Sequence, residues 1–330
     1  MRIGIMSFAH HHAEAYIHNL HILPGVELIG IADDDQARGR MYAQAHGTHL
    51  YANYQALFDD KPDGVIICSE NVRHRPLVER AAVAGVHVMC EKPLATTLAD
   101  GQAMIDACQQ AGVILMTAFP MRFSAPMQQV KDQIDEGALG QIYCINGTNQ
   151  GQMPIQHRAW FVDKSLAGGG SMMDHTVHLA DLLRWYLNSE VTEVYAVSNR
   201  ILQGDKVDVE TGGLIMLTFA DGTFASIDCS WSKPLNYPTW GGLTMELISA
   251  RGLTVVDAFR QNLQVYRQEP AAHGWAYWGS DADGGMVQEF VAAIREQRPA
   301  QVTGEDGYKA LEITLAAYES AASGQVVSLG

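Results

Sequence analysis

The sequence has few cysteines, few basic residues and no long apolar run. Its five cysteines are widely spaced, without a C-x-x-C pair, which argues against a zinc knuckle or a disulfide framework and fits a reducing compartment. Lys and Arg total 22 against 37 Asp and Glu, so a formal charge of −15 disfavours nucleic acid and anionic membranes as partners. A membrane span of ~20 apolar residues and the apolar segment of a signal peptide are both missing. We expect a cytoplasmic protein.

The length of 330 residues predicts two domains, because single hydrophobic cores stop growing at roughly 250–300 residues. Short apolar runs first alternate with helical patterns, which is typical of a parallel sheet with crossover helices. Strands are expected at 2–6, 26–32, 64–68, 86–90 and 113–118, and helices near 12–23, 35–46, 73–84 and 97–111. Residues 1–120 are therefore expected to form a doubly wound, nucleotide-binding α/β domain of the Rossmann type.

After residue 120 the strand-like segments become longer and are separated by turn residues. Ala220-Asp221-Gly222 and Ala250-Arg251-Gly252 have the composition of hairpin turns. Strands are expected at 141–148, 193–200, 213–219, 223–231, 243–249 and 252–257, and helices at 172–186, 286–296 and 305–323. Residues 121–330 are therefore expected to form an α+β domain with a large, mainly antiparallel open sheet.

Asp33 closes the second expected strand, roughly 20 residues after the first strand-to-helix turn. In a dinucleotide-binding fold a carboxylate at this position binds the adenosine ribose and disfavours the 2′-phosphate of NADP. The alternative is a solvated loop aspartate, since two more aspartates follow it. We interpret Asp33 as a cofactor residue that favours NAD.

The first strand-to-helix turn lacks the G-x-G-x-x-G fingerprint and reads Ser7-Phe8-Ala9-His10-His11-His12. Ser7 and Ala9 are small, and a helix beginning near His11 would direct free N–H groups at an anion. The three consecutive histidines look like a metal cluster, but neighbours on a helix point in different directions. We therefore expect a solvated helix start beside the cofactor, and no metal site.

Cys90-Glu91-Lys92-Pro93 follows the fourth expected strand, at the sheet edge where open α/β folds bind ligands. Lys92 could place an ammonium group beside the nicotinamide ribose and a substrate hydroxyl, and Pro93 could fix the backbone through a cis bond. A solvated lysine is the alternative.

A glycine run at Gly168 leads into a helix that carries Asp174, His175, His178 and Asp181. Asp174 and His178 stand four residues apart and share a face, so an acid and an imidazole could orient a hydroxyl and take its proton. Two alternatives are an acidic helix start favoured by the helix dipole and a His-x-x-His metal pair. The metal pair is disfavoured because no other spacing completes a ligand set.

Together these motifs resemble the Gfo/Idh/MocA oxidoreductases, essentially from end to end. The most specific segments are Asn71-Val72-Arg73-His74, Glu91-Lys92-Pro93, Met121-Arg122-Phe123, the G-G-G-x-x-x-D-x-x-x-H-x-x-D block from Gly168 to Asp181, and Val302-Thr303-Gly304-Glu305-Asp306-Gly307. The resemblance implies an N-terminal NAD(P)-binding Rossmann domain and a C-terminal open sheet that forms a homodimer or homotetramer. The chain departs from the family pattern at the first turn and at Ser69-Glu70, which replaces Thr-Pro.

By this resemblance Lys92 contacts substrate and nicotinamide ribose, Asp174 positions sugar hydroxyls, and His178 accepts the proton. The expected cofactor-binding residues are Ser7, Phe8, Ala9, His10, Asp33, Ser69, Asn71, His74, Glu91 and Lys92. The expected substrate-binding residues are Lys92, Arg122, Trp160, Asp174, His175 and His178. Four aromatic residues could stack on a sugar or simply pack in the core: Trp160, Trp231, Tyr237 and Trp240.

The combined expectation is an NAD-dependent oxidoreductase that acts on a secondary hydroxyl or ketone of a sugar, polyol or sugar derivative. Two alternatives remain open at this point. One is a glycoside-cleaving enzyme that recycles its NAD, and the other is a sugar-sensing regulator on the same fold. Release of a leaving group without net NADH would select the first, and tight binding without turnover the second.

Overall fold

The computed structural model describes residues 1–156, 158–267, 272–277 and 279–330. By its contacts the chain divides into two units. Unit 1 comprises Met1–Pro120, His157–Gly168 and Asp283–Leu311, and unit 2 comprises Met121–Gln156, Gly169–Ala282 and Glu312–Gly330. Unit 1 thus takes two segments from the second half of the sequence. The assignment of separate functions to 1–120 and 121–330 stays a prediction.

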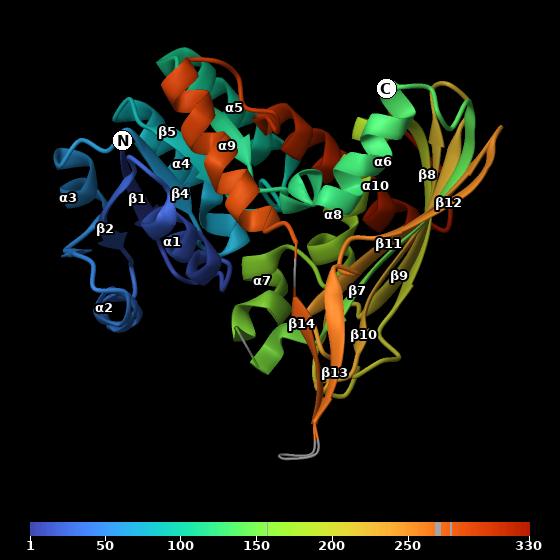
Figure 1. Cartoon of the computed structure of the whole chain (residues 1–330), viewed down its shortest axis with the longest axis horizontal. Helices are drawn as coiled ribbons and strands as arrows, with labels where there is room; N and C mark the ends of the chain where they lie inside the picture. Colours follow the sequence, from blue (N-terminus) through green and yellow to red (C-terminus); the bar gives the residue numbers. More distant parts are fainter. Residues whose placement is uncertain (157, 268–271, 278) are drawn as a thin grey trace. The chain divides into compact units, whose positions relative to one another are not determined.

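Unit 1 is built around a six-stranded parallel sheet (Figure 1). Its strands lie in the order β3 (Leu50–Tyr51), β2 (Glu27–Ala32), β1 (Arg2–Met6), β4 (Gly64–Ile67), β5 (His87–Cys90) and β6 (Leu115–Thr117). Its main helices are α1 (Ala13–Ile22), α2 (Gln36–Ala45), α3 (Tyr54–Asp59), α4 (His74–Val83), α5 (Leu98–Ala111) and α9 (Ala282–Glu296). This strand order is that of a dinucleotide-binding Rossmann fold, so the expected architecture is confirmed.

The sheet of unit 1 is buried on both faces, and this explains the continuous apolar runs of its strands. Residues Ile3, Ile5 and Met6 of β1 have no exposed surface. Helix α9 covers β4 closely, since a Cβ placed on Gly64 would lie 3.0 Å from the Phe290 ring. Because all strands are parallel, the segments that follow β1, β2, β4 and β5 meet at one edge of the sheet.

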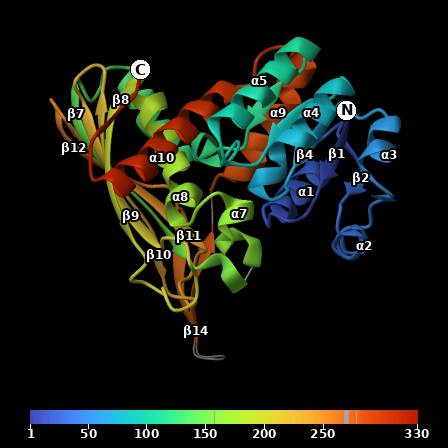
Figure 2. The same ribbon diagram turned by 180° about the vertical axis from the view of Figure 1, so that it is seen from behind.

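Unit 2 contains a seven-stranded sheet, shown from behind in Figure 2. Its strands lie in the order β12 (Gly252–Asp257), β11 (Gly241–Ser249), β7 (Ile142–Gln152), β10 (Phe224–Lys233), β9 (Gly212–Phe219), β8 (Val191–Asn199) and β15 (Val327–Ser328). Strands β7 and β10 are parallel and the other neighbours antiparallel, as expected for a mainly antiparallel sheet. A separate ribbon pairs β13 (Asn262–Arg267) with β14 (Ala272–Tyr277).

Helix α8 (Ser171–Leu187) packs on β7, β9 and β10 and covers one face of this sheet. The remaining elements are α6 (Ala125–Asp135), the short α7 (Lys164–Ala167), α10 (Gly304–Ser323) and 3-10 turns at Asn71–Arg73, Pro120–Phe123, Pro154–Gln156 and Ala159–Val162. None of the helices that the structure describes is both long and apolar enough to cross a membrane.

The other face of the unit 2 sheet exposes large apolar side chains. They alternate along the strands with buried residues, as Leu214 and Met216 do with Ile215 and Leu217 on β9. The exposed set is Tyr143, Tyr195, Val197, Leu214, Met216, Phe224, Ile248, Leu253 and Val255. Among the described residues of unit 2, no helix covers this face in either view (Figures 1 and 2).

Candidate functional site

The predicted site residues divide between the two units, and each group is described within its own unit. Unit 1 contains Ser7, Phe8, Ala9, His10, Asp33, Ser69, Asn71, His74, Glu91, Lys92 and Trp160. Most of these lie at the carboxyl ends of the parallel strands, where open α/β folds bind their ligands. Unit 2 contains Arg122, Asp174, His175 and His178.

The loop after β1 begins with Ser7 in the left-handed region, at a φ of 70°, where the fingerprint has a glycine. Four backbone N–H groups of this loop donate hydrogen bonds to acceptors within unit 1. The N–H of Ser7 donates to Ala32 O (2.7 Å), that of Phe8 to Asp33 Oδ2 (2.8 Å), that of Ala9 to Ser7 Oγ (3.1 Å) and that of His10 to Cys68 O (2.8 Å). These four N–H groups therefore have acceptors within unit 1, and the expected binding of an anion by free N–H groups at the helix start near His11 stays a prediction. A short loop satisfies its donors by folding back on its own strands.

Asp33 is held in place by the partners of its carboxylate. Arg38 donates to both oxygens, from Nε to Oδ2 (2.9 Å) and from Nη2 to Oδ1 (2.7 Å). The N–H groups of Phe8 and Asp35 also donate to this carboxylate (2.8 and 2.9 Å). The Asp33 side chain has no exposed surface and that of Arg38 is 20% exposed. Asp33 is therefore no solvated loop aspartate, and it also organises the first loop.

Glu91 is fully buried and joins the loop after β5 to the start of α1. Its Oε1 accepts the Tyr16 hydroxyl (2.6 Å) and lies 3.1 Å from His12 Nδ1, while its Oε2 accepts the Lys92 N–H (3.1 Å). Burial by itself would raise the pKa of Glu91, but His12 and Lys92 hold that pKa below its usual value. Burial likewise disfavours a charged His12, yet the Glu91 carboxylate raises the pKa of His12. The pair favours the ionised form of each partner.

Lys92 is 4% exposed and precedes Pro93 through a cis peptide bond, as the sequence suggested. The buried ring of His74 lies against this segment. Its Nδ1 is 3.1 Å from Pro93 O and 3.2 Å from Leu94 O, and its Nε2 is 3.3 Å from Ser69 O. Desolvation lowers the pKa of His74. His74 therefore ties the loop after β4 to the loop after β5.

Two further residues of unit 1 connect the sheet edge to the segment around residue 160. Asn71 donates from Nδ2 to Ala167 O (2.9 Å), and Trp160 donates from Nε1 to Ala9 O (3.0 Å). Trp160 packs with Ala9, Phe161 and Ala167 in one apolar cluster and is 8% exposed. Its contacts fit the packing alternative, and a role for it in binding substrate stays a prediction.

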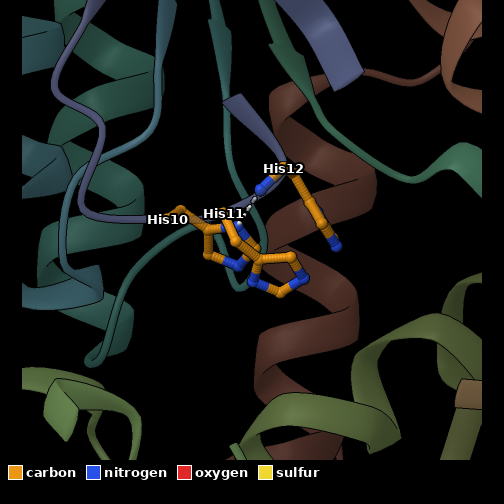
Figure 3. A group of neighbouring side chains, drawn as sticks. All are labelled: His10, His11 and His12. Atoms are coloured by element: carbon orange, nitrogen blue, oxygen red, sulfur yellow. Dashed lines mark hydrogen bonds between the residues drawn. The ribbon is translucent and has the colours of Figure 1, made fainter. Parts of the chain in front are cut away.

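The three histidines after β1 come together, as Figure 3 shows. One ligand nitrogen from each of His10, His11 and His12 lies within 4.8 Å of the others. The expectation that these side chains diverge is wrong, because α1 begins only at Ala13 and the three residues form the turn before it. Helical spacing does not apply to a turn.

In unit 2, the glycine run is explained by close contacts at the start of α8. A Cβ on Gly169 would lie 2.0 Å from the Tyr318 hydroxyl, and one on Gly170 would lie 2.1 Å from Glu210 O. Glu210 Oε1 accepts the N–H groups of Gly170 (2.9 Å) and Met172 (3.0 Å), and the Tyr318 hydroxyl donates to the same oxygen (2.6 Å). A carboxylate at a helix start stabilises it through the free N–H groups and the dipole.

Asp174 lies in the first turn of α8 and is 8% exposed. Its Oδ2 accepts the indole N–H of Trp231 (3.2 Å) and lies 3.1 Å from His175 Nε2. Trp231 has no exposed surface, so the suggestion that it stacks on a sugar is wrong. His178, one turn after Asp174 on α8, is half-buried. Tyr237 and Trp240 are half-buried as well.

Arg122 and Asp181 form a buried ion pair in unit 2. Arg122 donates from Nε to Oδ2 (2.8 Å) and from Nη2 to Oδ1 (2.5 Å), and its guanidinium lies 5.7 Å from the Trp185 ring centre. Both side chains are at most 7% exposed. Asp181, the last aspartate of the glycine-rich motif, therefore has a structural role as the ion-pair partner of Arg122. Binding of substrate by Arg122 stays a prediction.

Sequence reasoning missed three residues that shape these sites: Arg38, Glu210 and Tyr318. Arg38 stands five residues after Asp33, in the first part of an expected helix, and this spacing could have suggested an ion pair. Glu210 and Tyr318 come from segments far from α8 in the sequence, so no local signal identifies them.

Comparisons with known proteins agree with both units. Residues 2–119 match the NAD-binding Rossmann-fold domain of an oxidoreductase family, and residues 127–255 match the GFO/IDH/MocA C-terminal domain. Myo-inositol 2-dehydrogenase from Thermotoga maritima is 29% identical over 334 aligned residues, which cover 97% of this chain and 96% of that protein. 1,5-Anhydro-D-fructose reductase from Ensifer adhaerens is 30% identical over 92% of each chain.

A solved structure is similar over the whole chain. The crystal structure of GenD2 from gentamicin A biosynthesis, in complex with NAD, has a TM-score of 0.90 and 24% identity, and the match covers 100% of this chain and 96% of that one. This likeness supports the fold. Both family matches and the relative at 30% identity show that the chain belongs to the GFO/IDH/MocA oxidoreductases and that its N-terminal part is an NAD-binding Rossmann domain.

Proposed function

We propose that this oxidoreductase transfers a hydride between nicotinamide and a secondary hydroxyl or ketone of a sugar, polyol or sugar derivative, with NAD as its preferred cofactor. The names of the two relatives, which refer to a polyol and to a sugar derivative, support this substrate class. The observation that carries the proposal is the buried Asp174, whose Oδ2 is fixed by Trp231 and His175 on the helix that also bears His178.

The residues of unit 1 fit a dinucleotide. The strand order, Ser7 at positive φ in place of the first fingerprint glycine, and Asp33 after β2 match what such a cofactor requires. Asp33 would bind the adenosine ribose, and Ser69, Asn71 and Lys92 the nicotinamide side. Because the N–H groups of Ser7 to His10 already have acceptors, the phosphates would be held by other groups of this loop and by the start of α1. The bound nicotinamide supplies the hydride acceptor.

His178 is proposed as the base that takes the proton of the reacting hydroxyl, because imidazole titrates near neutral pH. Lys92 would donate to the same oxygen and stabilise the charge that develops on it. The buried ammonium of Lys92 suits this role, since a low-dielectric environment strengthens its interaction with an oxyanion.

Asp174 is proposed to accept hydroxyl groups of the substrate beside the reacting carbon. Trp231 and His175 hold its Oδ2, and a carboxylate offers about four acceptor positions to hydroxyl groups. Since both partners are buried, the carboxylate is oriented before substrate arrives and little freedom is lost on binding.

A panel of polyols, sugars and sugar derivatives with NAD, followed by the absorbance of reduced nicotinamide, tests the proposal. We expect at least one cyclic polyol or sugar to be oxidised, and His178→Ala to abolish that signal. Release of an aglycone without net NADH would instead indicate a recycled cofactor. Sugar binding without turnover on any member of the panel would contradict an enzymatic role.

We further propose that the exposed apolar face of the unit 2 sheet is covered by a second copy of the chain, as a homodimer or as part of a homotetramer, in a reducing cytoplasm. Patches of contiguous apolar side chains mark interfaces in most proteins. Leu214→Glu, at the centre of β9, should convert the oligomer to monomer in light scattering. Gln129→Glu, at an exposed position on α6 outside this sheet, is the control for a changed charge.

A further inference from the structure

The turn between β1 and α1 carries three imidazoles in one cluster, and the proposed hydride transfer gives none of them a role in the chemical step. The ring centres of His10 and His12 are 4.3 Å apart, those of His11 and His12 are 4.6 Å apart and those of His10 and His11 are 5.0 Å apart. Of the residues that the structure describes, these three form the one group of His, Cys, Asp or Glu whose ligand atoms converge closely enough for a metal ion. Figure 3 shows the cluster.

The spacing is close to what a metal ion needs. Zn²⁺ binds histidine nitrogen at about 2.0–2.1 Å in tetrahedral geometry, so two ligand nitrogens lie about 3.4 Å apart. The nitrogens of this cluster lie within 4.8 Å of one another. The widest pair therefore has to close by about 1.4 Å at most, and the stacked rings of His10 and His11, with an interplanar angle of 15°, have to rotate before both face one ion.

The carboxylate of Glu91 lies next to two histidines of the cluster. Glu91 Oε1 is 3.1 Å from His12 Nδ1 and 3.8 Å from His10 Nδ1, in a position without exposed surface. Metal-binding histidines are usually oriented by a carboxylate or carbonyl on the nitrogen that does not bind the metal. Glu91 is placed to do this for His12, and a metal ion at His12 Nε2 would displace the proton that Glu91 favours on this imidazole.

We propose that His10, His11 and His12 bind one transition-metal ion of the class that prefers imidazole, with Zn²⁺ as the principal candidate. Three protein ligands leave one coordination position open. The backbone N–H of His12 donates to His10 Nδ1 (3.2 Å) and so occupies the lone pair of that nitrogen. Binding of the ion by His10 Nδ1 therefore requires that this hydrogen bond break. The proposal does not depend on the substrate or on hydride transfer.

The test uses the full-length, metal-stripped protein without NAD. Calorimetric titration with ZnCl₂ should show one site per chain with a Kd below about 1 µM, and Co²⁺ should give the intense visible absorption of a near-tetrahedral site. His11→Ala, at a half-buried position, should weaken Zn²⁺ binding at least 100-fold. Glu91→Gln should weaken it about 10–100-fold, as loss of a carboxylate behind a ligand does elsewhere.

The control is the double variant His18→Ala/His21→Ala, which removes two exposed histidines of α1 outside the cluster. It should keep the wild-type affinity and stoichiometry. His12→Gln provides a second ligand variant, and the melting temperature of each protein without metal checks that it folds. The proposal is overturned if wild type lacks a stoichiometric site. It is also overturned if folded His11→Ala and His12→Gln keep the wild-type affinity, or if the control variant loses binding. All of these measurements are made without NAD or sugar, so a failure here is distinguishable from a failure of the sugar oxidation assay.

Discussion

Arg38 should limit how strongly the enzyme discriminates against NADP. Its guanidinium donates to both oxygens of Asp33, the carboxylate that would meet the 2′-phosphate. The two charges form a nearly neutral pair, so a phosphate approaching Asp33 is repelled less than by a free carboxylate. Arg38→Gln removes the compensating charge and should increase the preference for NAD. Asp33→Asn leaves Arg38 unpaired and should shift the preference toward NADP.

The size of the effect follows from Coulomb's law. Two unit charges about 5 Å apart interact with about 3 kcal/mol at an effective dielectric constant of ~20. Arg38 is 20% exposed, and salt screens the partly exposed charge, so a change of roughly 1–2 kcal/mol is realistic. The ratio of kcat/KM for NAD to that for NADP should therefore rise about 5- to 30-fold in Arg38→Gln.

The assay measures kcat/KM with both cofactors on one substrate, and the fluorescence of bound NADH and NADPH gives their Kd values independently of turnover. Arg73→Gln is the matched control, because Arg73 faces Asp34 at 3.5 Å with both side chains about half exposed. A ratio that is unchanged or lower in Arg38→Gln would refute the electrostatic argument. An equal change in Arg73→Gln would attribute the effect to net charge instead.

Three further predictions concern the catalytic groups and the buried histidine. Lys92→Ala and His178→Ala should each lower kcat by roughly 10²–10⁴ with little change in melting temperature, and near-wild-type turnover in either would exclude that residue from the chemical step. Trp231→Phe removes the N–H that donates to Asp174 and should lower kcat/KM about 10-fold, whereas an unchanged value would show that the hydrogen bond positions nothing. Burial lowers the pKa of His74, so the unfolded chain binds a proton at this imidazole more readily than the folded chain does. The free energy of unfolding should therefore fall as the pH decreases below about 6.5. Urea titrations of wild type and His74→Gln at several pH values measure this dependence, and an equal dependence in both proteins would contradict the prediction.

The strands of unit 1 could be predicted from the sequence because each is a continuous apolar run. The expected range 2–6 coincides with β1, and the range 86–90 contains β5. The two-residue strand β3 and the six-residue helix α3 were missed, since neither is long enough to show a period. The parallel pairing of β7 with β10 was missed too, because register between distant strands leaves no local pattern.

The candidate site could be predicted only as far as residue types and strand ends allow. Asp33, Lys92 and Asp174 were chosen because each follows a strand or opens a helix, and local sequence shows such positions. Their partners come from elsewhere in the fold: Trp231 reaches Asp174 from a strand 57 residues away, and His12 and Glu91 are 79 residues apart. The convergence of the histidines depended on where α1 begins, and helix ends are the least predictable part of a sequence.

The discontinuity of unit 1 has a consequence for synthesis of the chain. Its sheet is covered in part by residues made late, since Phe290 lies over Gly64 and the Thr117 hydroxyl donates to Thr303 O (3.0 Å). A ribosome that has produced residue 120 must add about 190 more before residue 311 appears. At roughly 5–20 residues per second this takes about 10–40 s. During that time the nascent sheet exposes apolar surface, so a fragment ending at residue 120 should aggregate and the growing chain should bind chaperones.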